Sequence, residues 1–467
     1  MKQNVLIVGA GVAGKELLKE IKKHKKLGII PVGFIDDDKN KIGKKIAGLQ
    51  ILGNRYSLKE HIANLSIDKV FIALPSVDGE IISYVLKICI EKGIPCQTIP
   101  GVREIIEGKV DIRRIREVQI EDLLDRPVRK HDVADVSMLL KNSTVMITGA
   151  AGSIGSELCR QIASYQPKKI IMYDWWENGL YELGIEFREF FNNCSVILIP
   201  GNIQDKFHIE ATLKKYKPTI IFHTAAYKHV PLMEENVVEA VKNNIFGTLN
   251  VVTAAVEAKI SKFVFISTDK AVNPKSIMGM TKLIGECITT SLNKNSKTMF
   301  ICVRFGNVLN SAGSVLPLFR KQLTSGVITV TDKKMTRFFM TIQEAVQLIL
   351  KASILGKKDE IFILDMGKPM KITDIAKKFI LLSGLIPEKD ITIKFIGQRP
   401  GEKLTEELTT DSENVTKTKF EKILVLKKKI VDRKKLLLFI AQLQSSCEKY
   451  NANDAKSLLK QFISKLS

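Results

Sequence analysis

Two glycine-rich turns, each between an apolar strand and a helical segment, constrain the fold more than any other feature of this chain. The first follows residues 4–8 and runs from Gly9 to Gly14 with G-x-G-x-x-G spacing, and the second follows residues 144–148 and runs from Gly149 to Gly155 with G-x-x-G-x-x-G spacing. Glycines there let the backbone turn tightly and approach a phosphate at the helix N-terminus. The repetition predicts an α/β chain with two doubly wound, mostly parallel sheets.

Apolar strands continue to alternate with helical segments after each turn. In the first part they cover residues 30–35, 70–74 and 94–99, and a charged connector follows at 103–129. A chain of 467 residues can form two or three cores. We predict a Rossmann-like domain over 1–125, a linker over 126–142 and a second Rossmann-like domain over 143–467. Whether the first domain binds a nucleotide stays open, because its glycine turn has no accompanying catalytic residues.

The formal charge of +22 comes mainly from lysines that are spread along the whole chain. No nucleic-acid-binding module accompanies them, so we expect solvated lysine faces and no nucleic-acid partner. Attraction to a diphosphate, or peripheral association with an anionic membrane, is compatible with this charge. No apolar run reaches 18 residues and the N-terminus has no signal-peptide pattern, so the expected location is cytoplasmic.

The seven cysteines are an odd number and show no C-x-x-C spacing. Four of them lie in apolar segments, namely Cys89, Cys159, Cys194 and Cys302. This usage favours buried free thiols and supports neither a disulfide framework nor a metal site.

A polar cluster at the end of a later apolar strand is the best candidate for chemistry. Residues 263–266 are apolar and are followed directly by Ser267-Thr268-Asp269-Lys270. After a turn at Pro274, a helical segment carries Met278 and Lys282 four residues apart, which places both on one face. Open α/β sheets bind their ligands at the carboxyl ends of the strands, so this cluster predicts an active site.

These residues resemble the active site of extended short-chain dehydrogenase/reductases, and most closely that of nucleotide-sugar 4,6-dehydratases. Thr268 and Lys282 match the family pattern, and Thr268-Asp269-Lys270 matches the dehydratase run. The position of the usual tyrosine is Met278. This departure is similar to the bacterial polysaccharide-biosynthesis branch that converts UDP-N-acetylglucosamine to a 4-keto-6-deoxy sugar with NAD. The resemblance also implies a UDP-sugar partner and a homo-oligomer, which such folds commonly form by pairing the helix that carries Lys282. Full-length relatives often carry a membrane anchor.

The expected cofactor site lies around the second glycine turn. Asp174 ends the strand after that turn, where a carboxylate would bind the ribose hydroxyls and favour NAD over NADP. The resemblance implies that Asn244 supports Lys282 from a neighbouring helix. The full set that it implies for NAD is Gly149, Gly152, Ser153, Ile154, Gly155, Asp174, Asn202, Ile203, Ala225, Ala226, Asn244 and Lys282.

The resemblance also implies a substrate-binding region, mainly over 305–345 and 395–467. The side chains expected to contact the nucleotide sugar are Lys228, His229, Asn307, Arg337, Arg399 and Glu402. For His229, a structural role in its loop is as well supported as a direct contact. The Lys-rich segment beyond residue 423 is expected to be helical, to pack against the domain and to form part of its surface.

The implied reaction oxidises C4, eliminates water across C5 and C6, and returns hydride to C6, so no external reductant is needed. Asp269 would be the acid at O6 and Lys270 the base at C5, with Asp269 protonated and Lys270 neutral when they act. Thr268 would bind O4 and Lys282 the nicotinamide ribose. A Met278 thioether cannot accept the O4 proton, so a relay through Thr268 or a water stays open.

Two other functions compete with this one. A 4-epimerase or reductase would ordinarily use the missing tyrosine, and a non-catalytic nucleotide sensor would need no acid–base pair. The configuration of the product at C5 stays open, although the resemblance to the methionine-containing long form favours retention of configuration at C5.

Overall fold

The computed structural model describes residues 2–24, 27–74, 79–99, 116–123, 134–291, 296–356, 360–410, 413–426 and 431–466. The chain forms two compact units. The first comprises residues 1–130 together with 318–330 and 372–396, and the second comprises 131–317, 331–371 and 397–467. Part of the predicted linker, residues 126–133, lies outside the described residues, as does most of the charged connector.

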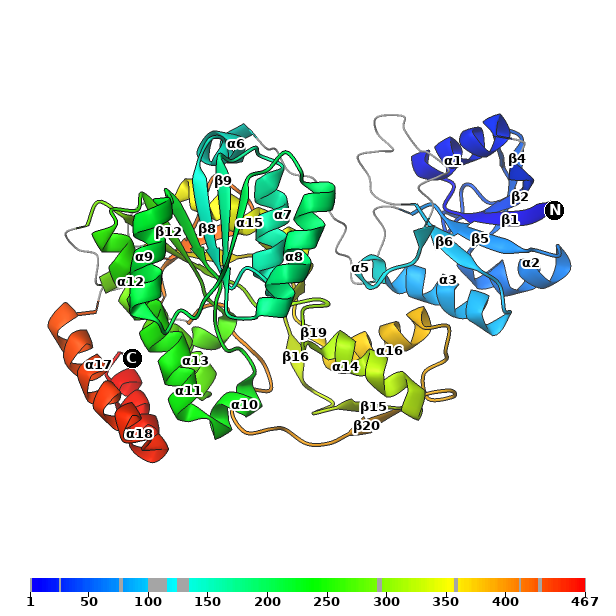
Figure 1. Ribbon diagram of the computed structural model, residues 1–467. Helices are drawn as coiled ribbons and strands as arrows, with labels where there is room; N and C mark the ends of the chain where they lie inside the picture. The colour runs from blue at the N-terminus through cyan, green and yellow to red at the C-terminus, as the bar shows by residue number, and fades with distance from the viewer. Residues whose placement is uncertain are drawn as a thin grey trace. The chain divides into compact units, whose positions relative to one another are not determined.

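The first unit is built on a seven-stranded sheet of order β3-β4-β2-β1-β5-β6-β7 (Figure 1). Its strands are β1 (Gln3–Val8), β2 (Ile29–Ile35), β3 (Lys45–Ile46), β4 (Leu49–Gly53), β5 (Lys69–Ile72), β6 (Cys96–Thr98) and β7 (Arg116–Glu117). Its helices include α1 (Val12–Lys23), α2 (Leu58–Asn64), α3 (Gly79–Glu91) and α5 (Ile120–Leu123). The central pairs are parallel, whereas β3 and β7 pair antiparallel at the two edges.

Two segments from the second half of the sequence pack with this first unit. They contribute α14 (Val315–Gln322), β15 (Val327–Val330), α16 (Ile372–Leu382) and β20 (Thr392–Phe395), and β15 pairs parallel with β20. Leu381 of α16 joins the core formed by α3 and the sheet, and Lys378 Nζ donates to the Leu123 carbonyl over 2.7 Å. Part of the predicted substrate-binding region, 318–330, therefore belongs to this unit.

The second unit is built on a nine-stranded sheet of order β10-β9-β8-β11-β12-β13-β18-β22-β21. Its strands are β8 (Thr144–Thr148), β9 (Lys169–Asp174), β10 (Val196–Pro200), β11 (Ile220–His223), β12 (Lys262–Ile266), β13 (Met299–Arg304), β18 (Glu360–Leu364), β21 (Val415–Lys417) and β22 (Ile423–Leu426). Seven strands run parallel, and β22 and β21 extend the sheet with antiparallel pairing. The predicted α/β class with two mostly parallel sheets is confirmed.

Helices cover both faces of this sheet, as Figure 1 shows for the second unit. They include α6 (Ala134–Leu140), α7 (Ser153–Ala163), α8 (Glu177–Phe190), α9 (Lys206–Tyr216), α10 (Val230–Glu235), α11 (Val237–Val241), α12 (Thr248–Glu257), α13 (Ile277–Ser291) and α15 (Ile342–Leu355), and the chain ends with α17 (Arg433–Glu448) and α18 (Ala452–Ser464). The prediction that the tail is entirely helical is wrong at β22, where four residues join the sheet instead.

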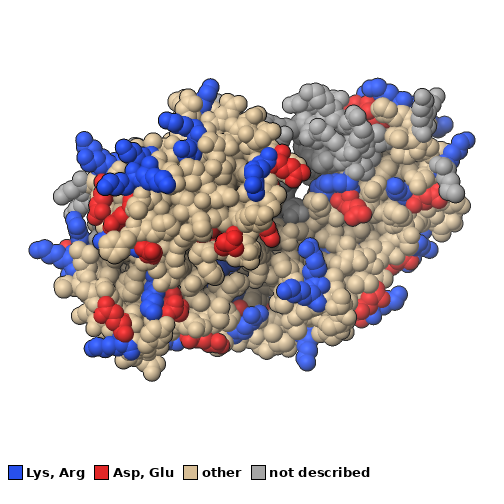
Figure 2. Space-filling view, viewed as in Figure 1, with Lys and Arg blue, Asp and Glu red and all other residues tan. Residues whose placement is uncertain are grey.

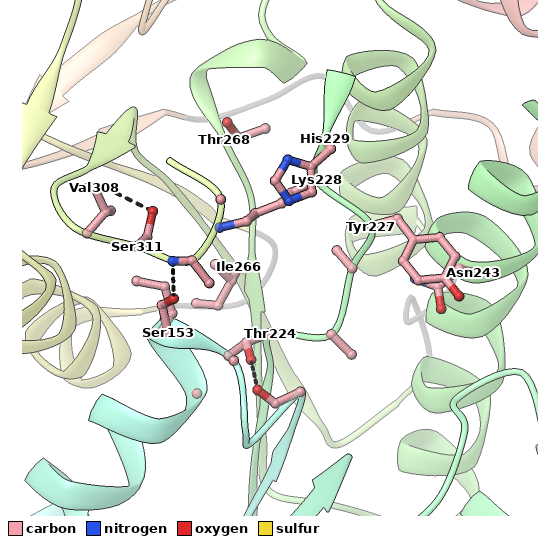
Figure 3. A pocket seen from close by; sticks show the side chains of 18 of the residues that line it. Ser153, Thr224, Tyr227, Lys228, His229, Asn243, Ile266, Thr268, Val308 and Ser311 are labelled. Carbon is pink, nitrogen blue, oxygen red and sulfur yellow. Dashed lines mark hydrogen bonds between the residues drawn. The ribbon is translucent and has the colours of Figure 1, made fainter. Parts of the chain in front are cut away.

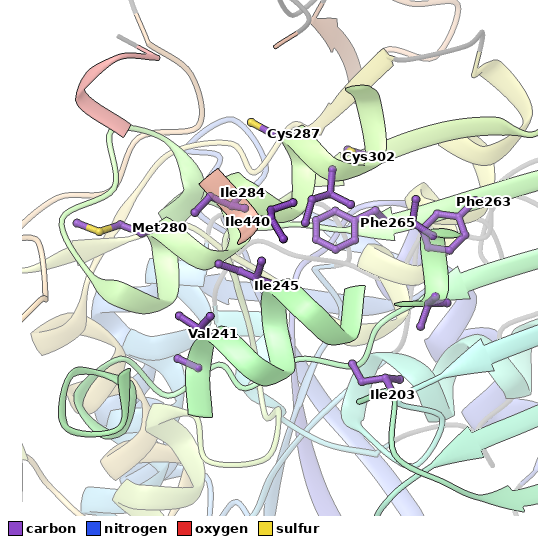
Figure 4. Close-up of a cluster of buried hydrophobic side chains, with 14 of the residues drawn as sticks. Ile203, Val241, Ile245, Phe263, Phe265, Met280, Ile284, Cys287, Cys302 and Ile440 are labelled. Carbon is purple, nitrogen blue, oxygen red and sulfur yellow. The ribbon is translucent and has the colours of Figure 1, made fainter. Parts of the chain in front are cut away.

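Helix α13, which carries Met278 and Lys282, is buried along its whole length. Figure 4 shows Ile284 and Cys287 of α13 in one apolar cluster with Phe265 of β12 and Ile440 of α17. Helices α10, α11, α12, α17 and α18 all contact α13. The chain therefore covers the helix that was expected to pair between subunits, and a homo-oligomer would have to use another face.

Charge and cysteine usage agree broadly with the sequence predictions. On the face shown in Figure 2, Lys and Arg side chains are dispersed, with acidic side chains between many of them. All seven cysteines are free, and the expectation of burial fails at Cys194 and also at Cys96, which are only half-buried. Among the described residues, no helix has the length and apolar character needed to cross a membrane, and no cluster of potential metal ligands occurs.

Candidate active site

A cavity of about 760 Å³ opens at the carboxyl ends of β8, β9, β11, β12 and β13 in the second unit. The sheet order reverses between β8 and β11, and such a switch point leaves a crevice for a ligand. The predicted site residues that line the cavity are Gly149, Gly152, Ser153, Ile154, Gly155, Asp174, Ile203, Ala225, Ala226, Lys228, His229, Thr268, Lys270, Met278, Lys282 and Asn307.

The second glycine turn forms one wall of this cavity. Gly149 has a φ of +71°, and a Cβ at that position would lie 2.6 Å from the backbone nitrogen of Ala225. A Cβ on Gly155 would overlap the Gly149 carbonyl oxygen, so both positions require glycine. Helix α7 begins at Ser153, and its N-cap residue Gly152 provides no side-chain cap. Uncapped first-turn amides beside a cavity fit a phosphate-bearing ligand.

Asp174 ends β9 beside this turn and orders the surrounding backbone. Its Oδ2 accepts from the Ala151 N–H over 2.8 Å, and its Oδ1 accepts from the Trp176 N–H over 2.9 Å. Burial raises the pKa of Asp174, against the lowering effect of these backbone bonds. Trp175 and Trp176 follow at the mouth of the cavity and are 63% and 49% exposed. The sequence showed these two residues but gave them no role.

Asn202 and Asn244 were predicted to contact the cofactor, and the structure places neither against the cavity. The Asn202 side chain accepts from the Gln204 N–H, as an Asx turn does. Asn244 lies in a π-helical turn (Lys242–Gly247) and clamps the backbone N–H and C=O of Tyr227 over 2.8 and 2.9 Å. It also donates to Thr281 Oγ1 on α13 over 3.0 Å. Asn244 therefore supports the loop that lines the cavity and the residue next to Lys282.

The amine of Lys282 is fully buried at the cavity wall. Its Nζ donates to the Ile266 carbonyl over 2.6 Å and lies 4.1 Å from the centre of the Phe265 ring. Burial lowers the pKa of Lys282 to about 8, and the opposing effect of Glu286 is smaller. Burial therefore disfavours the charged form of this amine, as is typical of groups that assist proton transfer.

Thr268, Asp269 and Lys270 form one hydrogen-bonded cluster after β12. Thr268 Oγ1 donates to Asp269 Oδ1 over 2.8 Å, and Lys270 Nζ donates to the same oxygen over 2.9 Å and to Asn307 Oδ1 over 3.1 Å. Thr268 is the N-cap of a short 3₁₀ turn (Asp269–Ala271), and its hydroxyl accepts from the Lys270 N–H over 3.4 Å.

Asp269 differs from its neighbours because it is fully buried and does not line the cavity. Gly306 does line it, and a Cβ on Gly306 would lie 3.0 Å from Asp269 Oδ2. The absence of a side chain at Gly306 therefore leaves the carboxyl group close behind the cavity wall. Asp269 reaches the cavity through its bonds to Thr268 and Lys270.

The predicted sugar-side residues Lys228, His229 and Asn307 share the cavity with Thr268. Figure 3 shows Lys228, His229, Thr268 and Ser311 around the same space. Burial lowers the pKa of Lys228, and burial followed by the charge of Lys228 lowers the pKa of His229. The Ser311 loop is tied to the glycine turn, since the Ala312 N–H donates to Ser153 Oγ over 2.9 Å.

Arg337, Arg399 and Glu402 were expected to hold the substrate, and the structure does not bring them to the cavity. Arg337 is buried, and its guanidinium donates to the backbone carbonyls of Thr336, Lys403 and Leu404. The bonds to Lys403 and Leu404 join Arg337 to the loop that contains these two residues. Arg399 is 45% exposed and faces its neighbour Glu402 over 3.9 Å.

Comparisons with known proteins place this arrangement in a family. Residues 145–428 match the polysaccharide biosynthesis protein family, and residues 1–100 match a CoA-binding domain family. The chain is 44% identical over 426 residues to the capsular polysaccharide biosynthesis protein CapD of Staphylococcus aureus, covering 90% of this chain and 71% of CapD. It is 34% identical over 289 residues to a UDP-N-acetylglucosamine 4,6-dehydratase (inverting) of Campylobacter jejuni, covering 61% of this chain and 82% of that protein.

Solved structures share the fold of the second unit. The X-ray structure of Pen from Bacillus thuringiensis has a TM-score of 0.58 and 34% identity, covering 63% of this chain and 92% of Pen. DesIV, a dTDP-glucose 4,6-dehydratase from Streptomyces venezuelae solved with NAD bound, has a TM-score of 0.50 and 18% identity, covering 57% of this chain and 88% of DesIV. The chain therefore belongs to the polysaccharide biosynthesis protein family, within the extended short-chain dehydrogenase/reductases.

Proposed function

We propose that this protein is an NAD-dependent dehydratase that converts UDP-N-acetylglucosamine to UDP-2-acetamido-2,6-dideoxy-4-keto-hexose. The observation that carries the proposal is the position of Lys270 Nζ at the cavity, between Asp269 Oδ1 at 2.9 Å and Asn307 Oδ1 at 3.1 Å. An amine held against a carboxylate suits proton transfer at C5, because the C5 proton becomes acidic once C4 is a ketone. The Campylobacter relative named as a UDP-N-acetylglucosamine 4,6-dehydratase supports the choice of substrate.

The chain would hold NAD with the glycine turn, Asp174 and Lys282, and NAD supplies hydride acceptance at C4 and hydride return at C6. Asp174 favours unphosphorylated ribose because a second negative charge would be repelled. Lys282 lines the same cavity as Thr268, where its charge stabilises negative charge on nearby oxygens. Lys270 then takes the C5 proton. Asp269 supplies the proton that O6 needs as it leaves.

Thr268 provides a route for the O4 proton where Met278 provides none. The O–H bond of O4 breaks as Thr268 Oγ1 accepts its proton, and Thr268 passes its own proton to Asp269 Oδ1, 2.8 Å away. The carboxyl so formed is the source of the proton later needed at O6, and this proton returns through Thr268 because Asp269 does not line the cavity. Lys270 finally returns a proton to C5 and the O4 proton leaves with O6, so the net reaction loses only water. The Lys270 ammonium exchanges its protons with solvent, which is how deuterium enters at C5.

A 4-epimerase is the second candidate, since the chain is 33% identical over 280 residues to UDP-glucose 4-epimerases of Rickettsia bellii, covering 58% of this chain. Incubation with UDP-N-acetylglucosamine in deuterated water, read by NMR, separates the two functions. A dehydratase incorporates deuterium at C5 and gives a 6-deoxy-4-keto product whose C5 configuration the same spectrum assigns. An epimerase gives neither change, and binding without turnover would overturn both proposals.

Intrinsic fluorescence gives a direct test of the cofactor site. The chain has two tryptophans, and Trp175 and Trp176 both line the cavity beside Asp174. We expect NAD to change their emission in a saturable way and NADH to receive energy from them. The matched variant Asp174→Asn should bind NAD about tenfold more weakly, the loss of roughly one charged hydrogen bond. An emission unchanged at saturating NAD would contradict this site.

A further inference from the structure

Behind Lys270 lies a second buried carboxylate, Glu406, which the sequence prediction did not include. Its side chain is 4% exposed, and its Oε1 lies 3.9 Å from Lys270 Nζ. Glu406 does not line the cavity, so it reaches the cavity only through Lys270. Asp269 and Glu406 are therefore the two carboxylates that approach the same amine.

Each of these carboxylates keeps one oxygen that is buried and unpartnered. Among the described residues, Asp269 Oδ2 and Glu406 Oε2 are the carboxylate oxygens that are buried without a hydrogen-bond partner. A buried oxygen of this kind costs free energy, which a merely structural ion pair would avoid by using both oxygens. The other oxygen of each carboxylate faces the amine of Lys270, Asp269 Oδ1 at 2.9 Å and Glu406 Oε1 at 3.9 Å.

Three cations face Glu406 from separate parts of the chain. Lys270 comes from the turn after β12, Arg337 Nε lies 4.0 Å from Oε1, and Lys403 Nζ lies 4.0 Å from Oε2. The Arg337 guanidinium donates to the backbone carbonyls of Thr336, Lys403 and Leu404. The Lys403 amine donates to the backbone carbonyl of Val272. Burial raises the pKa of Glu406, Lys270 opposes that rise, Asp269 adds to it, and Arg337 and Lys403 oppose it.

We propose that Glu406 is a positioning residue, which holds Lys270 at the cavity wall and governs the pH at which Lys270 releases its proton. This inference rests on the proposed role of Lys270 as the base. A carboxylate on the side of the amine away from the cavity keeps Nζ near Asp269 and Asn307 and favours the ammonium form. Removal of its charge should make proton release easier and leave the amine less well placed.

The test compares three variants of the full chain: Glu406→Gln, Glu406→Asp and the neighbouring Glu407→Gln. Glu407 is exposed and bonds Asn273, so its variant controls for the loss of one acidic residue in the same loop. The first readout is acetylation of Lys270 by acetic anhydride from pH 5 to 10, followed by peptide mass spectrometry, with the exposed Lys214 as internal reference. It needs no substrate and therefore does not depend on turnover.

We expect Glu406→Gln to move the Lys270 labelling curve toward lower pH by about one unit, and Glu407→Gln to leave it in place. Glu406→Asp keeps the charge and should restore the curve. With UDP-N-acetylglucosamine, the acid limb of kcat should move in the same direction in Glu406→Gln, and kcat should fall about tenfold with KM within about twofold of the original.

Superimposable labelling curves for Glu406→Gln and the unchanged protein would overturn the inference. If Glu406→Gln fails to fold, Glu406→Asp still decides it, because a labelling curve displaced in that variant contradicts a role through charge. The labelling curve of Glu406→Gln could shift although the unchanged protein does not dehydrate UDP-N-acetylglucosamine. That result would support the effect of Glu406 on Lys270 and reject the proposed function.

Discussion

Lys270→Met is expected to abolish dehydration of UDP-N-acetylglucosamine while NAD still binds. A positioned general base contributes about 10²- to 10⁴-fold, so kcat should fall by at least that factor. Methionine has nearly the length of lysine and cannot accept a proton, so the variant removes the chemistry and keeps most of the volume. Tryptophan emission should respond to NAD as before, because Trp175 and Trp176 follow β9, which β8 and β11 separate from β12 and Lys270.

Deuterium exchange at C5 isolates the step that Lys270 serves. The variant should leave the C5 hydrogen in place even after long incubation in deuterated water, and it should accumulate no 4-keto-6-deoxy product. Lys275→Met is the matched control, because Lys275 is exposed on the same turn and does not line the cavity. Turnover of Lys270→Met close to that of Lys275→Met would exclude Lys270 as the base.

The sequence was sufficient to predict the location of side chains that come directly after a strand or on the helix that follows it. Thr268 and Lys270 come immediately after β12, and Lys282 lies one helical turn beyond Met278, so local geometry alone brings them to one edge of the sheet. Asp269 was chosen by the same rule, yet its side chain turns inward behind Gly306. Alternation along three consecutive residues does not show which of them faces a cavity.

Residues from distant segments are the ones that the structure places away from the cavity. Arg337 and Arg399 were expected to contact the nucleotide sugar, but neither lines the cavity, and the Arg337 guanidinium donates to the backbone carbonyls of Lys403 and Leu404. Glu406 lies in the same loop as these two carbonyls and approaches Lys270 across more than 130 residues of sequence. Such contacts depend on where a loop packs, and neither periodicity nor strand-end spacing contains that information.

The packing of the C-terminal segment was likewise not predictable from the sequence. A Lys-rich composition predicted surface helices, and α17 and α18 are helices, but they cover α13. Before these helices, the chain also enters the sheet as β22, which pairs antiparallel with β18. Ile423–Leu426 is too short and too uniformly apolar for periodicity to separate strand from helix.

Arg304→Met should destabilise the second unit by about 3–5 kcal/mol, the largest stability effect we expect from a single change. Arg304 and Glu286 are 1% and 0% exposed, and their fork is bidentate, with Nε–Oε1 at 2.7 Å and Nη2–Oε2 at 2.8 Å. The guanidinium also binds Glu413, and Ser267 Oγ donates to Glu286. Loss of Arg304 removes the buried positive charge to which both carboxylate oxygens of Glu286 are hydrogen-bonded. The free energy of unfolding should be measured by urea titration with tryptophan emission, which reports only the second unit.

Arg160→Met is the control for the same fork geometry with much less burial. Arg160 forms the same fork with Glu186, with Nε–Oε1 at 2.6 Å and Nη2–Oε2 at 2.9 Å, but its side chain is 36% exposed. An exposed pair contributes about 0–1 kcal/mol, so this variant should unfold nearly as the unchanged protein does. Equal losses for the two variants would show that burial does not set the strength of the Arg304 cluster. A larger loss for Arg304→Met would show that burial strengthens this cluster, which links Ser267 at the end of β12 through Glu286 and Arg304 to Glu413.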